Sequence, residues 1–224
     1  MKSIAEVIAT KKLILWDFDG CFCDSEPIHC QAYTRAFAEY GHTINKAEYF
    51  ETFTHTGGGI AKEIENYNLT CNSEEIRIAK AKYYWELISN GQAKLFPEIS
   101  EILLKLQQLN IKSVIASNSS KKEIELILSH LTEKVSIEKI FGLQPGLRKK
   151  PFPDIFNHAL STLEISPKDA LVIEDSERGL LAARDAQCDA IWVKTYLTED
   201  FNSNAPHLGK ITHGELLAVL NNIV

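Results

Sequence analysis

Two aspartates stand directly after one of the most hydrophobic short segments of the sequence. Residues 13–16 are all apolar and lead into Asp17 and Asp19, and Asp24 follows close behind. Carboxylates at this spacing can act as a nucleophile and as a general acid and base. The ordinary alternative is a turn at the end of a strand, in which aspartates bind backbone N–H groups. Other parts of the sequence decide between these two interpretations.

More residues that could do chemistry stand at the ends of other apolar segments or before a predicted helix. Ser117 ends the segment 111–117 and Asn118 follows it, and Glu174 and Asp175 end the segment 170–175. Lys149 and Lys150 precede the predicted helix at 153–165. In an open parallel sheet, ligands bind at the carboxyl ends of the strands. Four converging loops would therefore place carboxylates, a hydroxyl and an ammonium group around one point.

Such a cluster of carboxylates repels itself at neutral pH unless protons or a cation compensate the charge. A shared proton is one solution and a divalent cation is the other, and oxygen ligands favour Mg²⁺ over zinc or copper. Lysine and Mg²⁺ together bind phosphate, and Ser117 could donate to a phosphate oxygen. This combination favours phosphoryl transfer, with Asp17 as the nucleophile and Asp19 as the general acid and base.

The predicted elements alternate between strands and helices over most of the chain. We expect strands at 12–17, 111–117, 137–142, 170–175 and 190–194, and helices at 97–110, 120–131, 153–165 and 176–188. Ser120 and Ser176 are the expected N-caps of two of these helices. The alternation predicts an α/β fold with a Rossmann-like parallel sheet, right-handed crossovers and flanking helices. A surface loop at 198–209 is expected to precede a last amphipathic helix.

One region interrupts this alternation, because residues 26–94 contain no convincing buried strand. Helical patterns instead cover 27–40, about 58–67, and 73–90. The sequence therefore predicts a core domain formed by residues 1–25 and 95–224, with an inserted helical cap subdomain at 26–94. Three glycines, Gly57, Gly58 and Gly59, could bind an anion through backbone N–H groups, but a flexible turn is the interpretation that we prefer.

Composition limits the partners of the chain. It has 224 residues, a net charge of −6 and 24% charged residues, which argues against a nucleic-acid-binding surface. No apolar run approaches the roughly 20 residues needed to span a bilayer, and no signal peptide is visible. The five cysteines lack metal-site spacing and are expected to be free thiols in a reducing compartment. We expect a cytoplasmic monomer or weak dimer that binds a small phosphorylated metabolite and neither nucleic acid nor membrane.

Four ordered motifs carry a resemblance to a known family. The segments "DFDGCFCDSEPIH", "ASNSS", "KKPFPDIF" and "VIEDSERGL" resemble those of the haloacid dehalogenase superfamily of hydrolases, and more narrowly its phosphatase and β-phosphoglucomutase-like branch. The resemblance extends over residues 12–194. An Asp-x-Asp-Gly motif alone is weak, but the complete ordered set is specific. The resemblance implies a Mg²⁺-dependent phosphatase acting on a small phosphorylated metabolite, for example a sugar phosphate, through an aspartyl-phosphate.

The resemblance also implies a role for each matching residue. Asp17 is the nucleophile, and Asp19 is the general acid and base. Ser117 and Lys150 hold the transferred phosphoryl group, with Asn118 beside it. The implied Mg²⁺ ligands and their support are Asp17, Asp19 through its backbone carbonyl, Asp175 and Glu174. The inserted helices would close over the site and select the substrate.

Some positions depart from the branch or leave alternatives open. His29 matches a cap-hinge histidine of mutase-like relatives, and a residue on a helix face is the equally weighted alternative. Those mutases grip a second phosphate with an arginine of the cap, whereas "TGGGIAKEI" offers Ile60 and Lys62 there. This difference favours a phosphatase over a β-phosphoglucomutase-like phosphotransferase. A catalytically idle binding protein is a third hypothesis, against which the costly charge cluster argues.

Overall fold

The computed structural model describes residues 2–49, 52–53, 59–131, 135–196 and 202–223. Contacts divide the chain into two compact units. The first, called the core unit below, consists of Met1–Asp24 and Lys94–Val224, and the second, the helical unit, consists of Ser25–Ala93. Among the described residues, no helix is long and apolar enough to cross a membrane.

The core unit is built on a six-stranded parallel sheet with the strand order β5-β4-β1-β6-β7-β8. Its strands are β1 (Leu13–Trp16), β4 (Lys112–Ala116), β5 (Lys139–Phe141), β6 (Ala170–Glu174), β7 (Asp189–Val193) and β8 (Lys210–Ile211). The five expected strands are thus confirmed, and β8 was not expected. Two further short strands, β2 (Cys23–Asp24) and β3 (Lys94–Leu95), form a separate antiparallel pair.

The register of the central strands determines which residues meet at the carboxyl end of the sheet. Trp16 lies beside Ile115 of β4 and Ile173 of β6. The next residue along β1 is therefore level with the ends of both neighbouring strands. Asp17 continues the ladder, because its backbone N–H donates to the carbonyl of Ile173 at 2.9 Å.

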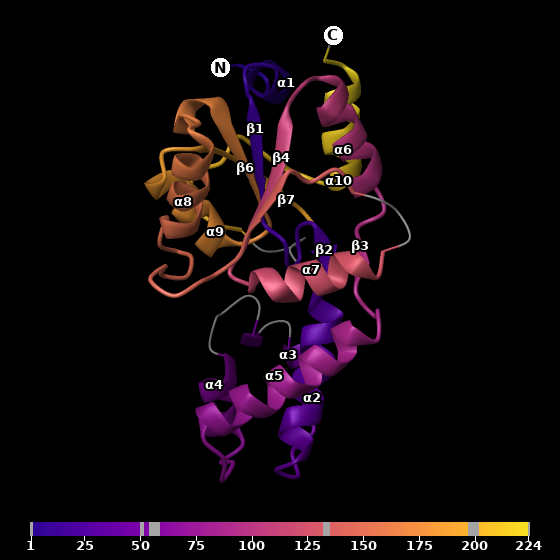
Figure 1. The fold of residues 1–224 in the computed structure, drawn as a ribbon. Coiled ribbons are helices and arrows are strands. Elements are labelled where there is room, and N and C mark those ends of the chain that lie inside the picture. The colour runs from indigo at the N-terminus through magenta and orange to yellow at the C-terminus, as the bar shows by residue number, and fades with distance from the viewer. Residues whose placement is uncertain (1, 50–51, 54–58, 132–134, 197–201, 224) are drawn as a thin grey trace. The chain divides into compact units, whose positions relative to one another are not determined.

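Helices cover both faces of this sheet (Figure 1). On one face lie α8 (Asp154–Leu163) and α9 (Glu177–Asp185), and on the other lie α6 (Ile99–Gln108) and α10 (His213–Asn221). The short α1 (Ile4–Ile8) contacts α10. Helix α7 (Lys121–Ser129) follows β4 and contacts β5. Ser120 and Ser176 cap α7 and α9 through their side chains, which confirms the two expected N-caps.

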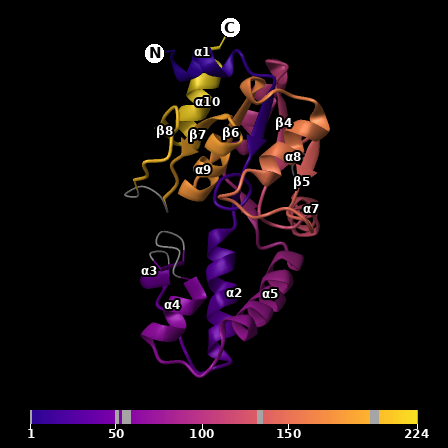
Figure 2. The ribbon, with the colours of Figure 1, turned by 90° about the vertical axis from the view of Figure 1, so that its left-hand side faces the viewer.

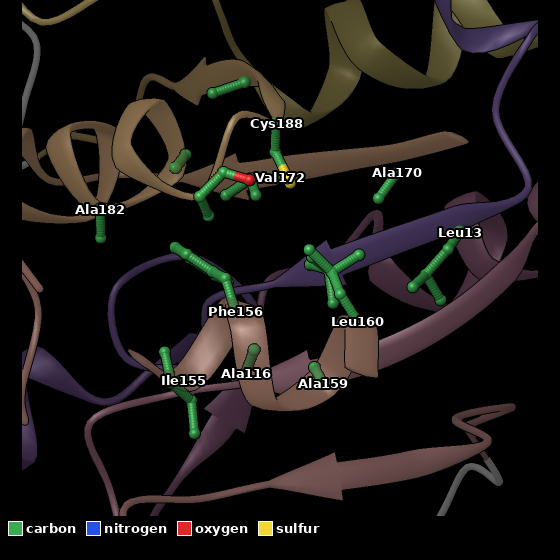
Figure 3. Close-up of a cluster of buried hydrophobic side chains, with 14 of the residues drawn as sticks. Leu13, Ala116, Ile155, Phe156, Ala159, Leu160, Ala170, Val172, Ala182 and Cys188 are labelled. Atoms are coloured by element: carbon green, nitrogen blue, oxygen red, sulfur yellow. Dashed lines mark hydrogen bonds between the residues drawn. The ribbon is translucent and has the colours of Figure 1, made fainter. Parts of the chain in front are cut away.

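A buried apolar cluster fixes the central strands against α8 and α9 (Figure 3). Phe156 and Leu160 of α8 lie against Leu13 of β1 and Val172 of β6, and all four side chains are almost completely buried. Burying a side chain of this size contributes about 1.5 to 3 kcal/mol to folding. The strand that carries Asp17 is therefore held rigidly, which a site built at its end requires.

The helical unit consists of α2 (Glu26–Ala38), α3 (Lys46–Tyr49), α4 (Gly59–Asn66) and α5 (Ser73–Ser89). Helices α2 and α5 lie side by side (Figure 2). Their shared core includes Phe37 and Ile76, both fully buried. Gly57 and Gly58 lie outside the described residues, so the structure does not test the expected glycine turn there.

Candidate active site

Side chains from four segments of the core unit meet at the carboxyl end of the sheet. Lys150, from the segment before α8, lies at the centre. Its Nζ atom is 2.5 Å from Oδ1 of Asp17, 2.7 Å from Oε1 of Glu174 and 2.9 Å from the carbonyl oxygen of Ala116. Lys150 itself is only 2% exposed. The predicted convergence of the loops is therefore present around one buried ammonium group.

The charges of this cluster control one another. Burial alone would lower the pKa of Lys150, but the carboxylates of Asp17 and Glu174 outweigh that effect and raise it above its ordinary value. Burial, with Glu174 nearby, raises the pKa of Asp17 to about 7, although Lys150 opposes this shift. One lysine therefore does not compensate all the negative charge, and an additional cation would favour the ionised form of Asp17.

Three carboxylates form a group with the geometry of a cation site. One oxygen each of Asp17, Glu174 and Asp175 lies within 4.8 Å of the other two. The group offers only carboxylate oxygens, which suit Mg²⁺. The residues present therefore fit this ion. The side chain of Asp19 is not part of the group, and the ligand expected from Asp19 was its backbone carbonyl.

Glycine is required where the loop after β1 approaches Asp175. Gly20 has a φ of +76°, and a Cβ atom at this position would collide with the Asp175 carboxylate. Both the left-handed backbone and the close approach exclude other residues. The Gly that completes Asp-x-Asp-Gly thus allows the loop after β1 and the loop after β6 to meet.

Glu174 is fully buried, and both of its carboxylate oxygens have partners within the protein. Oε1 accepts from Lys150, while Oε2 accepts from the backbone N–H groups of Asp175 and Ser176, both at 3.1 Å, and from Oγ of Ser176 at 2.9 Å. Glu174 therefore orients Lys150 and Asp175 at the same time, in addition to contributing charge to the acidic group.

We expect Gly179→Ala to damage the site through Glu174. A Cβ atom at Gly179 would overlap the Glu174 carboxylate. Overpacking of this kind costs about 1–3 kcal/mol, which lowers the melting temperature by about 2 to 12 °C for a chain of this size. Turnover should fall too, because Lys150 loses its support. Thermal unfolding followed by circular dichroism, with a phosphatase assay, measures both effects.

Gly214→Ala is the matched control for this prediction. The nearest atoms to a Cβ at Gly214 are Oγ1 of Thr212 at 3.9 Å and Oε1 of Glu98 at 4.0 Å, which are ordinary contacts. This variant should retain wild-type turnover and melting temperature. Equal behaviour of the two variants would contradict the role given to Glu174.

The residues that follow β4 form hydrogen bonds with one another and with two other segments of the site. Ser117 is buried, and its Oγ accepts from the backbone N–H of Ser119 at 3.1 Å. Oδ1 of Asn118 accepts from the backbone N–H of Lys150 at 2.9 Å, so Asn118 fixes the lysine segment. The hydroxyl of Ser119 donates to the carboxylate of Asp19. The phosphate-binding roles of Ser117 and Asn118 stay predictions.

The sequence analysis missed three side chains that donate hydrogen bonds to residues of the site. They are Ser119, Arg178, which donates to the carbonyl of Lys150 at 2.7 Å, and Trp192, which donates to the carbonyl of Asp175 at 2.9 Å. Only Arg178 gave a signal. A cation in the first turn of a helix is electrostatically unfavourable, so its presence there indicates another purpose.

His29 lies in α2 of the helical unit. Its ring stacks on Tyr84 with centroids 4.3 Å apart and planes 4° from parallel. This contact agrees with the interpretation of His29 as a packed residue on a helix face. Its role in a hinge stays a prediction.

The fold and the site define an α/β protein with a Rossmann-like parallel sheet, whose strands carry acidic residues and a buried lysine at their carboxyl ends. The sequence pattern of the family described as haloacid dehalogenase-like hydrolase matches residues 14–193. The chain therefore belongs to this family, and the expected fold, with a parallel sheet and a cap, is confirmed. The expected assignment as a hydrolase of the phosphatase type is confirmed as well.

Individual relatives narrow the family to one branch. Protein CbbY of Rhodobacter capsulatus is 27% identical over 204 residues, which are 86% of this chain and 90% of that protein. The β-phosphoglucomutase of Bacillus subtilis is 29% identical over 194 residues, which are 81% of this chain and 83% of that protein. The chain thus groups with the CbbY and β-phosphoglucomutase-like branch, as the motifs indicated.

Two crystal structures of CbbY from Rhodobacter sphaeroides agree with the same branch. One, in complex with phosphate, has a TM-score of 0.78 and 27% identity, and covers 94% of this chain and 99% of that one. The other, of a variant in complex with xylulose-(1,5)bisphosphate, has a TM-score of 0.77 and 26% identity, with the same coverage.

Proposed function

We propose that the chain is a Mg²⁺-dependent phosphatase of a small phosphorylated sugar that works through an aspartyl-phosphate at Asp17. The observation that carries the proposal is the position of Lys150, whose buried ammonium group joins Asp17 to Glu174 beside a three-carboxylate group. A mere structural ion pair needs one carboxylate for one ammonium group. The additional acidic groups support the proposal, because a further cation would compensate their negative charge and could then bind an anionic substrate.

The reaction assigns a step to each residue. The carboxylates of Asp17 and Asp175, with the backbone carbonyl of Asp19 and support from Glu174, would hold Mg²⁺, which neutralises charge on the phosphoryl oxygens. A carboxylate oxygen of Asp17 attacks phosphorus, so that an O–P bond forms and the ester P–O bond breaks. Asp19 donates a proton to the departing oxygen.

Hydrolysis of the acyl phosphate completes the cycle. Asp19, now ionised, takes a proton from water, and the resulting hydroxide attacks phosphorus and releases inorganic phosphate and the Asp17 carboxylate. Lys150 and Ser117 hold the phosphoryl oxygens in both steps, with Asn118 beside them. The helical unit is proposed to act as the cap that the sequence predicts at 26–94, which excludes bulk water during the first step.

The substrate class follows from the relatives. CbbY has been crystallised with phosphate and, as a variant, with xylulose-(1,5)bisphosphate. We therefore expect a sugar phosphate or sugar bisphosphate to be hydrolysed faster than a generic ester such as p-nitrophenyl phosphate.

A panel of phosphorylated sugars tests the proposal. Released phosphate is measured with Mg²⁺, with EDTA, and with EDTA followed by excess Mg²⁺. We expect turnover on at least one sugar phosphate, loss of at least about 99% of it in EDTA, and recovery on adding Mg²⁺ back. Turnover that EDTA leaves unchanged would contradict the assigned cation site. Measurable Mg²⁺ binding without hydrolysis of any compound would favour a binding protein instead.

A β-phosphoglucomutase-like phosphotransferase is the second candidate, which the similarity to the Bacillus subtilis enzyme favours. Such chemistry needs a grip on a second phosphate. At the start of α4, Ile60 is buried, and Lys62 is the exposed cation nearby. Interconversion of glucose phosphates, assayed with a bisphosphate activator, separates the two reactions. We expect phosphate release to exceed interconversion.

A further inference from the structure

The loop that carries Asp17 and Asp19 is a closed turn of backbone hydrogen bonds. The N–H groups of Phe22 and Cys23 both donate to the carbonyl of Phe18, at 3.0 and 2.8 Å, and the N–H of Gly20 donates to the carbonyl of Cys23 at 2.9 Å. The turn is buried, since Phe18, Cys21 and Phe22 are all 0% exposed. A small displacement of any carbonyl in it therefore moves the whole loop.

The carbonyl of Cys21, at the middle of this turn, accepts from a residue close to the end of the chain. Nε2 of His213 lies 2.7 Å from this oxygen, across 192 positions of sequence. A carbonyl oxygen can only accept, so Nε2 must carry the hydrogen. A buried carbonyl without a donor is unfavourable, so this contact selects one position of the turn.

His213 is held in place from its own side. It is the first residue of α10, it is 5% exposed, and its ring stacks on Phe96 with centroids 4.6 Å apart. The residue before it, Thr212, caps the helix in a reciprocal capping box with Glu215. Because α10 packs against α6, the His213 ring is part of the helical layer that covers one face of the sheet.

We infer that His213 is a positioning residue, which acts through the Cys21 carbonyl to hold the Asp17–Asp19 turn in its catalytic geometry. This inference rests on the proposed function, because the proposed function gives the Asp17–Asp19 turn its catalytic role. Asp19 lies two residues before Cys21 and must reach the leaving oxygen. Loss of the His213 contact should therefore lower kcat, whereas KM depends on groups that His213 does not touch.

Two amide variants of equal polarity test the contact. The terminal nitrogen of glutamine can occupy the place of Nε2 of histidine, whereas that of asparagine lies nearer the place of Nδ1 and falls short. We expect His213→Asn to lower kcat by about ten- to a hundredfold with KM changed less than about twofold, and His213→Gln to restore most of the loss.

Thr212→Ala is the matched control, because it weakens the start of α10 without touching Cys21. It should lower the melting temperature and leave kcat unchanged. If the asparagine variant does not fold, His213→Phe, which keeps a ring against Phe96 but has no donor, takes its place. Equal kcat in the asparagine and glutamine variants would overturn the inference. A fall of kcat in Thr212→Ala that accompanies its fall in melting temperature would overturn it as well.

Amide hydrogen exchange provides a readout that does not depend on turnover. Peptides that cover residues 18–23 should exchange about tenfold faster in His213→Asn than in His213→Gln or Thr212→Ala. If the wild type hydrolyses none of the sugar phosphates, the proposed function fails, yet faster exchange would still show that His213 holds the turn. Unchanged exchange at 18–23, with an active wild type, would overturn the inference about His213 alone.

Discussion

Replacing Asp17 by asparagine is expected to abolish phosphatase turnover, with a loss of at least about 10⁴-fold in kcat. An amide oxygen is a poor nucleophile and does not balance the charge of Lys150. The protein should still fold, because Lys150 keeps its contacts with Glu174 at 2.7 Å and with the Ala116 carbonyl at 2.9 Å. Circular dichroism and a steady-state phosphate-release assay check the two parts of this prediction.

Asp24→Asn is the matched control within the same segment. Asp24 ends β2, accepts a hydrogen bond from Tyr196 at 3.0 Å, and has no oxygen in the three-carboxylate group. This variant is expected to retain at least about half of the wild-type kcat. Residual turnover of more than about 1% in folded Asp17→Asn would show that another group attacks phosphorus.

Lys150→Met is expected to remove both activity and stability. The variant leaves the buried carboxylates of Asp17 and Glu174 without the cation between them. Breaking a buried pair in this way costs about 3–5 kcal/mol, which corresponds to a fall of about 6 to 20 °C in melting temperature. Turnover should fall by about 10³-fold or more, because a phosphoryl-binding charge is lost. Both quantities are measured with and without Mg²⁺, since added Mg²⁺ should recover part of the stability.

The neighbouring lysine separates this effect from a general loss of positive charge. Lys149 is exposed, whereas Lys150 is 2% exposed. Lys149→Met should therefore change the melting temperature by about 2 °C or less and leave kcat within about twofold. If the two methionine variants behave alike, the central position of Lys150 has no functional meaning.

The order of the strands and helices could be predicted because local patterns determine it. The apolar segments that became β1, β4, β6 and β7 each end at polar residues, and Ser120 and Ser176 mark the starts of α7 and α9. The expected elements did not include α1, α3, β2, β3 or β8, which are all two to five residues long. The pairing of β8 with the edge of β7 is a tertiary event, since two residues carry no periodicity. Helix α1 had a usable signal, the capping box of Ser3 and Glu6.

The site could be predicted as far as residue types at strand ends allow. We expected Asp17, Lys150 and Glu174 to meet, because charged residues at the carboxyl ends of parallel strands lie at one edge of the sheet. The register of β1 and β6 and the contacts of Lys150 bring them together. Two donors to backbone carbonyls could not be predicted. Trp192 and His213 donate to carbonyl oxygens of distant loops, and an indole or imidazole gives no sign in the sequence of which carbonyl it will meet. Only the packed structure determines these pairs.

The most direct test is to find the covalent phosphoryl group. Asp19→Ala, which lacks the group that activates water, is incubated with Mg²⁺ and an activated donor such as acetyl phosphate, quenched in acid and digested for mass spectrometry. We predict one phosphoryl group on Asp17 that decays slowly, and none in the Asp17→Asn/Asp19→Ala double variant. A phosphoryl group on any other residue, or hydrolysis at the wild-type rate by Asp19→Ala, would contradict the account.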